Sequence, residues 1–168
     1  MQNVRVIGTG QLFELQRKLR AAGHENIRSS MQRRIRHAAE PLRDGLQTAI
    51  RTTDIRSDGR KSGKRGGPSP TSRPLRATIA EAIRISVRTS GNPGARVWID
   101  KGRLPPDLRR MPTVINDGRI RHPVFGNKKR WATQWATPLW WDRTVQQHEP
   151  RMKSEVERVV DDVIRRLN

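Results

Sequence analysis

The sequence predicts an α+β fold in which a small antiparallel sheet packs on long helices, with a long basic loop and a C-terminal helix. Three observations lead to this prediction: a long run of helical apolar spacing, two alternating runs on either side of a turn signal, and a second helical run at the end of the chain. With 168 residues, of which 33% are hydrophobic, we expect a single domain over residues 1–168 with a modest core.

The N-terminal part predicts one strand and two helices. Residues 3–7 alternate apolar and polar side chains and predict a short strand that could join the sheet. Residues 11–22 carry apolar side chains three and four apart, which predicts a short helix that Gly23 ends. A longer pattern from Asn26 to Ile50 predicts a helix that kinks at Pro41 without losing its apolar phase. Several arginines share its polar surface, where we expect a solvated face: Arg28, Arg33, Arg34, Arg36 and Arg43.

Residues 57–74 contain glycine, proline, serine and cations but no hydrophobic side chain, so they predict a flexible loop that orders only on a partner. The alternative is a tolerated insertion without a role. We take its cations as candidate assembly or DNA contacts: Arg60, Lys61, Lys64, Arg65 and Arg73. The glycines lack the spacing of a nucleotide-binding loop.

The middle of the chain predicts a hairpin and then irregular structure. A helical turn from Leu75 leads into an alternating run that ends at Arg88, and residues 90–94 form a strong turn signal before a second strand over residues 95–99. Three prolines make residues 102–118 irregular, with a helical turn near residues 107–110.

The last helix is predicted over residues 142–168, with Asp142 as its N-cap. Pro150 is expected to limit the regular part to residues 151–167. Pairs spaced as ordinary helical ion pairs are Glu155 with Arg158 and Asp162 with Arg166.

Residues 119–141 hold four of the five tryptophans, Trp131, Trp135, Trp140 and Trp141, beside a basic run of Lys128, Lys129 and Arg130. Indoles interleaved with cations can stack nucleic-acid bases. We favour inward packing of Trp131 and Trp135 against the last helix, because a density of large apolar groups is seldom left in water.

No catalytic, cofactor or metal site is predicted. Cysteine is absent, no two of the four histidines have metal-ligand spacing, and no cluster of carboxylates emerges. Neither a signal pattern nor an apolar run of membrane-spanning length appears, so we expect a protein of an aqueous interior.

The net charge of +19 predicts an anionic partner, either phosphate backbones or acidic protein surfaces. Residues 142–168 carry six cations and six anions, so the whole excess lies in residues 1–141. The charge pattern therefore predicts one cationic side and one neutral end.

A short motif makes the chain resemble a known family. His122, Pro123, Phe125, Gly126 and Asn127 are followed by Trp131, Gln134 and Pro138, which lead into the last helix. With the order of elements around it, this motif resembles the neck or tail-completion proteins of long-tailed phages, which include the Z-type tail-completion proteins of lambda-like phages.

The resemblance implies a structural virion protein without enzymatic activity or cofactors, made in the host cytoplasm. It implies a homo-oligomeric ring, commonly sixfold, between the capsid connector and the tail. Its partners would be head-closure or adaptor proteins, tail terminator or tail-tube proteins and, without sequence reading, packaged DNA. Lys128, Lys129 and Arg130 would join the loop cations as contacts. The high charge and the Trp140–Trp141 pair depart from the family pattern.

Two other classes remain open. A basic nucleic-acid-binding protein of ribosomal or nucleoid type would explain the charge directly and predicts salt-sensitive binding of duplexes by the monomer. A small hydrolase or nuclease would need an acidic metal cluster, which the scattered carboxylates do not supply.

Overall fold

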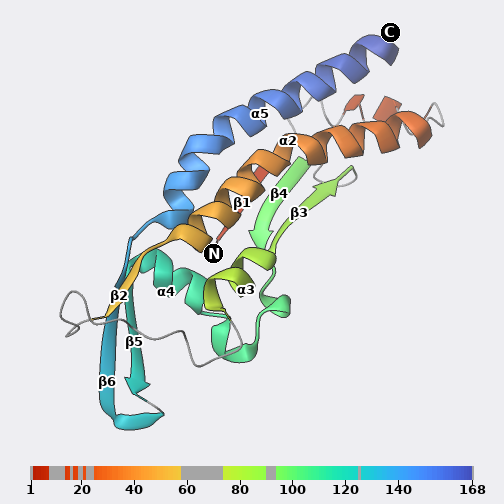
Figure 1. Ribbon diagram of the computed structural model, residues 1–168. Coiled ribbons are helices and arrows are strands. Elements are labelled where there is room, and N and C mark those ends of the chain that lie inside the picture. Colours follow the sequence, from red (N-terminus) through yellow and green to blue (C-terminus); the bar gives the residue numbers. More distant parts are fainter. Residues whose placement is uncertain are drawn as a thin grey trace.

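The structure is a computed structural model, and its main feature is a pair of long helices that lie side by side and run in opposite directions (Figure 1). Each helix is continuous through an internal proline. Two three-stranded antiparallel sheets complete the fold, which confirms the α+β class. The residues that the structure describes are 2–7, 14, 15, 17, 18, 21, 25–57, 74–89, 94–124 and 126–167.

The core lies between the two long helices and the first sheet. Helix α2 (Glu25–Thr52) buries one apolar stripe at the predicted spacing, because residues three and four apart share a helix face. Helix α5 (Trp140–Leu167) packs a matching stripe against it. The largest fully buried side chains of the two stripes are Met31, Ile35, Leu42, Leu46, Ile50, Met152 and Val156.

The prediction for the start of α5 was wrong. The helix begins at Trp140 and not at Asp142, and Pro150 lies in its interior instead of limiting it. Trp140 and Trp141 are buried, so the first turn is fixed by packing of its indoles rather than by a capping side chain of its own. Leu139, just before the helix, has a left-handed backbone with φ of 61°.

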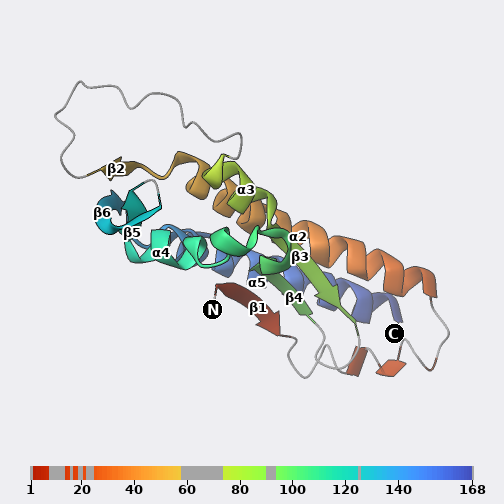
Figure 2. The same cartoon turned by 90° about the horizontal axis from the view of Figure 1, so that it is seen from below.

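The first sheet has the strand order β1 (Asn3–Ile7), β4 (Gly94–Ile99), β3 (Ile83–Arg88). The predicted hairpin strands and the predicted addition of residues 3–7 are therefore confirmed. Helix α3 (Leu75–Glu81) precedes β3 as expected. The sheet packs on α2, and Figure 2 shows its three strands from below.

A second sheet, which the sequence analysis did not predict, has the order β2 (Ile55–Ser57), β6 (Asn127–Ala136), β5 (Arg119–Val124). The sequence analysis missed this sheet because its strands bury few apolar side chains, which leaves only a weak apolar alternation. Strands β5 and β6 form a hairpin that projects from the helical body (Figure 1).

The segment between the sheets is more regular than predicted. It contains two short 3₁₀ turns, η1 (Lys101–Arg103) and η2 (Pro106–Leu108), and the helix α4 (Met111–Asp117). Pro112 lies in the first turn of α4. The backbone N–H that proline lacks would have no hydrogen-bond partner within the helix at this position, so Pro112 is compatible with the start of α4.

Several predictions fall on residues outside the described ranges. The described residues of the predicted helix over 11–22 are helical, and Leu15 among them is buried. Most of the predicted loop, residues 58–73, lies outside, and so do all five of its candidate contacts: Arg60, Lys61, Lys64, Arg65 and Arg73. In the part of the chain that the structure describes, no helix combines the length and apolar character that crossing a bilayer requires.

Candidate protein or nucleic-acid interface

One face of the β5–β6 hairpin gathers tryptophan and arginine. In the register of the hairpin, Arg119 lies opposite Trp135, Arg121 opposite Thr133 and Pro123 opposite Trp131. Directly paired residues point to the same side of a sheet. Strand β2 adds Arg56 beside Trp135 on the same side. We call this surface the hairpin face, and its residues are Arg56, Arg119, Arg121, Pro123, Trp131, Thr133 and Trp135.

Both tryptophans of the hairpin face are open to solvent. Trp131 is 51% exposed and Trp135 is 48% exposed, so the prediction that they pack inward against the last helix was wrong. Their spacing of four residues fits one side of a strand as well as one side of a helix, which is why it misled. Two half-exposed indoles on a projecting hairpin favour a contact with another molecule, because monomers seldom leave such groups in water.

An arginine guanidinium group lies over each of these indole rings. The Cζ atom of Arg121 lies 5.5 Å from the centre of the Trp131 ring, and that of Arg119 lies 5.6 Å from the Trp135 ring. These are cation–π distances. The Trp131 indole also donates from Nε1 to the Lys128 carbonyl oxygen, with 2.9 Å between the atoms. The contacts hold the rings in place before any partner binds.

The hairpin is strongly cationic. Strands β5 and β6 contain no carboxylate, and the predicted contacts Lys128, Lys129 and Arg130 are exposed at the start of β6. Asp54, which directly precedes β2, binds Arg56 with 2.5 Å between Oδ2 and Nε. A partner of this hairpin therefore needs an anionic surface that also accepts aromatic rings.

The motif that carries the family resemblance is divided between strand and turn. His122 is exposed and Pro123 half-buried, and both lie on β5. Pro123 is tolerated because β5 is an edge strand in the described part of the sheet. Gly126 lies at the reversal with φ of 76°, a conformation that favours glycine. Phe125 lies outside the described residues.

Trp140 and Trp141 have a structural role. They are 5% and 4% exposed and meet edge to face, with 5.7 Å between ring centres. The Trp140 Nε1 group donates to the carbonyl oxygen of Pro112 at 3.3 Å. The pair thus joins the start of α5 to α4.

The sequence analysis missed Arg119 and Arg121 as site residues. The available signal was the alternation Arg119-Ile120-Arg121, in which Ile120 is buried and the two arginines face the other way. One apolar residue between two arginines is a weak strand signal, and only the pairing with β6 brings these arginines over the tryptophans.

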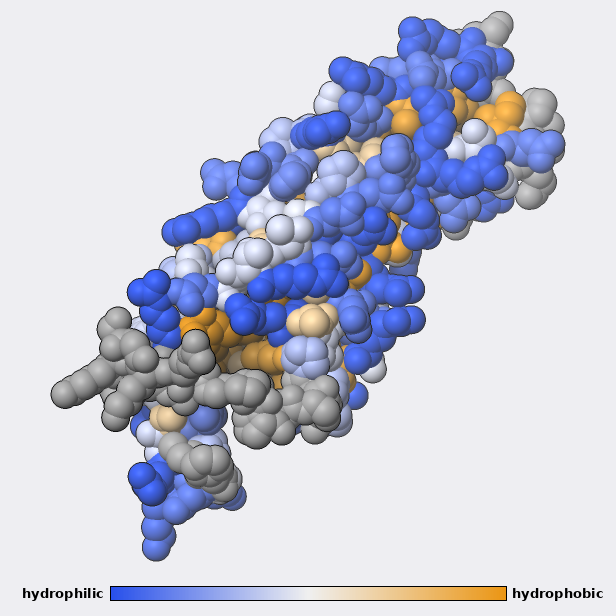
Figure 3. Space-filling view, viewed as in Figure 1, coloured by the Kyte–Doolittle hydropathy of each residue, from blue (hydrophilic) through white to orange (hydrophobic). Residues whose placement is uncertain are grey.

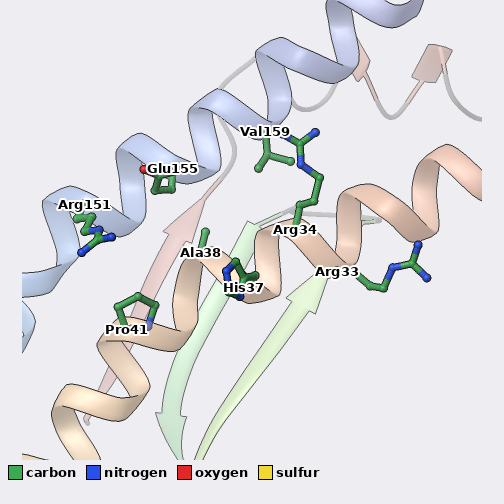
Figure 4. Close-up of a pocket in the computed structure, with 8 residues that line it drawn as sticks. All are labelled: Arg33, Arg34, His37, Ala38, Pro41, Arg151, Glu155 and Val159. Carbon is green, nitrogen blue, oxygen red and sulfur yellow. The ribbon is translucent and has the colours of Figure 1, made fainter.

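A groove of about 470 Å³ lies between α2 and α5, where its lining includes Arg33, Arg34, His37, Arg151 and Glu155 (Figure 4). Figure 4 shows Arg34 directed toward α5 and Arg33 directed away from it. Arg34 binds Asp162 with 2.6 Å between Nη2 and Oδ2. His37 similarly lies 2.6 Å from Glu40. The Arg34 guanidinium group in this groove is thus already paired with a carboxylate of the chain itself.

Among the described residues, no group of three or more histidine, aspartate and glutamate side chains is close enough to hold a metal ion. The face seen in Figure 3 is mainly hydrophilic, with hydrophobic residues in small separate patches. The hairpin face is therefore the candidate site that geometry and chemistry single out.

Comparison of the chain with protein-family models, with curated proteins and with solved structures finds no match.

Proposed function

We propose that this protein is a structural subunit that forms an oligomeric ring in the neck of a long-tailed phage. The ring joins the capsid connector to the tail, leaves a channel for DNA and belongs to the virion. The proposal rests on the resemblance of the motif His122 to Pro138, together with one observation from the fold: a projecting hairpin with two half-exposed tryptophans.

The composition of the hairpin face supports a protein contact. Tryptophan and arginine are the residues most enriched among those that dominate binding energy at protein interfaces. Trp131 and Trp135 supply large apolar area, and Arg119 and Arg121 supply charge that can pair with carboxylates of a neighbour. A hairpin that projects from the body can reach a neighbouring subunit or an adjoining ring.

Mass photometry and negative-stain images of the full chain test the proposal. We expect annular particles that contain several copies of the 19.3 kDa chain. The double variant Trp131→Ala, Trp135→Ala should dissociate them. Leu139→Ala is the matched control, because Leu139 is 46% exposed but lies outside the hairpin face. Rings that survive the double variant would show that another surface drives assembly.

The second candidate is a basic nucleic-acid-binding protein of ribosomal or nucleoid type. The same two indoles favour it, because they are half-exposed on a strand that also carries cations. Exposed bases stack on aromatic side chains in such a setting. Monodisperse monomers that bind nucleic acid tightly would support this candidate against the ring. A ring that forms only on its partner also gives monomers, so the position of the gene is a further test: between capsid and tail-tube genes for a neck protein.

A further inference from the structure

We propose that the outer face of the sheet β1–β4–β3, with adjoining arginines of α2, binds the phosphate backbone of duplex DNA. This surface is distinct from the hairpin face and contains none of the contacts predicted from the sequence. Its residues are Arg28, Arg36, Arg84, Arg88, Arg96 and Trp98, and we call it the sheet face. The inference rests on the proposed function only for the source of the duplex, which is the packaged genome.

Strand alternation separates the two sides of this sheet. Ile83, Ala95, Val97 and Ile99 are buried toward α2. The residues between them point the other way, so Arg84 and Arg88 of β3 are exposed. Trp98 pairs with Arg84 in the register, and Arg96 pairs with Ser86. The outer side therefore offers arginines from two neighbouring strands.

The cationic surface continues around the free edge of β3. Arg36 of α2 donates from Nη1 to the Ile85 carbonyl oxygen at 3.3 Å, and Arg28 donates from Nε to Thr89 Oγ1 at 3.2 Å. These bonds hold two further guanidinium groups at the free edge and the end of β3. Arg84 and Arg88 are four residues apart on one strand, which places them about 13 Å apart.

Charge segregation favours a polyanion. The described strands of both sheets carry no carboxylate but ten cations: Arg5, Arg56, Arg84, Arg88, Arg96, Arg119, Arg121, Lys128, Lys129 and Arg130. Glu81 and Asp100 flank the first sheet at the end where Ile83 pairs with Ile99. Arg88 and Arg28 lie toward the opposite end, so the attraction for phosphate increases along the sheet.

Arg96 is held in a geometry that suits phosphate. Its Cζ atom lies 4.7 Å from the centre of the Trp98 ring, which orients the planar guanidinium group. Its Nε atom is buried and has no acceptor among the described residues. A duplex cannot reach this buried atom, so Arg96 supplies its charge and the exposed part of its side chain to the contact. The cations Arg84 and Arg88 are exposed nearby and can contact further phosphates.

The chemistry of the sheet face differs from that of a protein or membrane contact. Protein interfaces have an apolar centre, as the hairpin face does. Among the six residues named for the sheet face, Trp98 is the one large apolar side chain, and it is half-buried under Arg96. An interfacial membrane contact likewise needs apolar side chains to insert. Arginines without an apolar centre fit the regular charge of a duplex, about one per 1.7 Å of axis.

The test is the binding of the full chain to a fluorescent 30-base-pair duplex of mixed sequence, measured by anisotropy over a range of salt concentrations. The variant R84Q/R88Q/R96Q should bind at least tenfold more weakly. Its plot of log affinity against log salt should lose about 0.9 of slope for each phosphate contact removed. The control R51Q/R109Q/K153Q removes the same charge from exposed positions elsewhere and should lose less than threefold. R84Q/R88Q alone should show a smaller loss and avoids changing half-buried Arg96.

Equal losses in the variant and the control would overturn the inference, because net charge alone would then explain binding. An equal loss of poly-L-glutamate binding would also overturn it and indicate an acidic protein partner. The two proposals fail separately. Rings that stay intact, with duplex binding that the sheet-face substitutions leave unchanged, would contradict this inference alone. A W131A/W135A variant that still forms rings, and whose duplex binding still depends on the sheet face, would contradict the role of the hairpin face alone.

Discussion

The side-chain oxygen of Asn116 accepts a hydrogen bond from the backbone N–H of Trp141, with 3.0 Å between the two atoms. The same side chain donates from Nδ2 to Asp142 Oδ2 at 2.6 Å. Its backbone oxygen accepts from the Leu139 N–H at 2.8 Å. Asn116 lies in α4, so a residue 25 positions earlier in the chain caps the start of α5. The base of the hairpin and the long helix are thereby fixed to each other.

Asn116→Ala should lower the free energy of unfolding by about 1–2 kcal/mol, the usual cost of losing a helix cap. Urea unfolding followed by circular dichroism measures the change. Thr113→Ala is the control, since Thr113 is an exposed residue of the same helix. A loss for Asn116→Ala no greater than for Thr113→Ala would show that water replaces the cap without cost.

The buried and exposed tryptophans should respond very differently to truncation. Trp140→Ala removes a ring that is 5% exposed and should cost about 3–5 kcal/mol of stability. Trp131→Ala removes a ring that is 51% exposed and should cost less than about 1 kcal/mol in the monomer. Unfolding at low protein concentration, where any assembly would be dissociated, measures both. Similar losses would mean that Trp131 is buried in the folded monomer, contrary to the geometry described here.

Gly45 lies where α2 packs tightly against α5. A Cβ atom at Gly45 would lie 2.8 Å from Nε2 of His148 and 3.3 Å from Cγ2 of Thr144. Replacing a helical glycine by alanine normally stabilises a helix by up to about 1 kcal/mol. Here we expect Gly45→Ala to destabilise the protein by about 1–3 kcal/mol, because the added methyl group overpacks the helix contact.

The double variant Gly45→Ala, His148→Ala tests the cause. Removing the imidazole ring makes room for the methyl group, so Gly45→Ala should become neutral or stabilising in the His148→Ala background. Thermal unfolding of the four proteins gives the coupling between the two sites. Independent effects of the two changes would place the overpacking elsewhere than at His148.

Much of the helical core was predictable from the sequence because its signal is dense. The apolar positions of α2 recur from Met31 to Ile50, and those of α5 recur from Met152 to Val163, with little ambiguity of period. The hairpin of β3 and β4 was predictable for a similar reason, since alternation on both sides of a turn signal fixes strand and register.

The second sheet and the candidate site were not predictable in the same way. In strand β6 only Ala136 is buried, so the sequence shows no apolar pattern that would indicate a strand. The spacing of Trp131 and Trp135 fits a helix as well as a strand. Arg119 and Arg121 lie over these rings only because β5 pairs with β6. The sheet face similarly depends on long-range neighbours, because Arg28 reaches Thr89 only after α2 packs on β3.

Asp162 provides a pH-dependent link between the long helices. Its carboxylate accepts from Arg34 of α2 at 2.6 Å and from Arg165 at 2.5 Å, whereas the sequence analysis paired it with Arg166. The hydrogen bond from Arg34, then that from Arg165, lowers the pKa of Asp162 below the usual 3.8. Between the lowered value and 3.8 the unfolded chain binds more protons than the folded chain, so acidification favours unfolding there.

Asp162→Asn removes this contribution, which is complete above pH 3.8 and is lost as the pH falls through the lowered pKa. The urea midpoint of the variant should therefore lie below that of the parent at pH 6, and the two should converge toward pH 2.5. Asp161→Asn is the control, because Asp161 is the exposed neighbour on the same helix and should show a smaller difference. Added salt should also reduce the difference at pH 6, since both partners are partly exposed. A gap between Asp162→Asn and the parent that stays constant down to pH 2.5 would show that the ionised carboxylate is not its source.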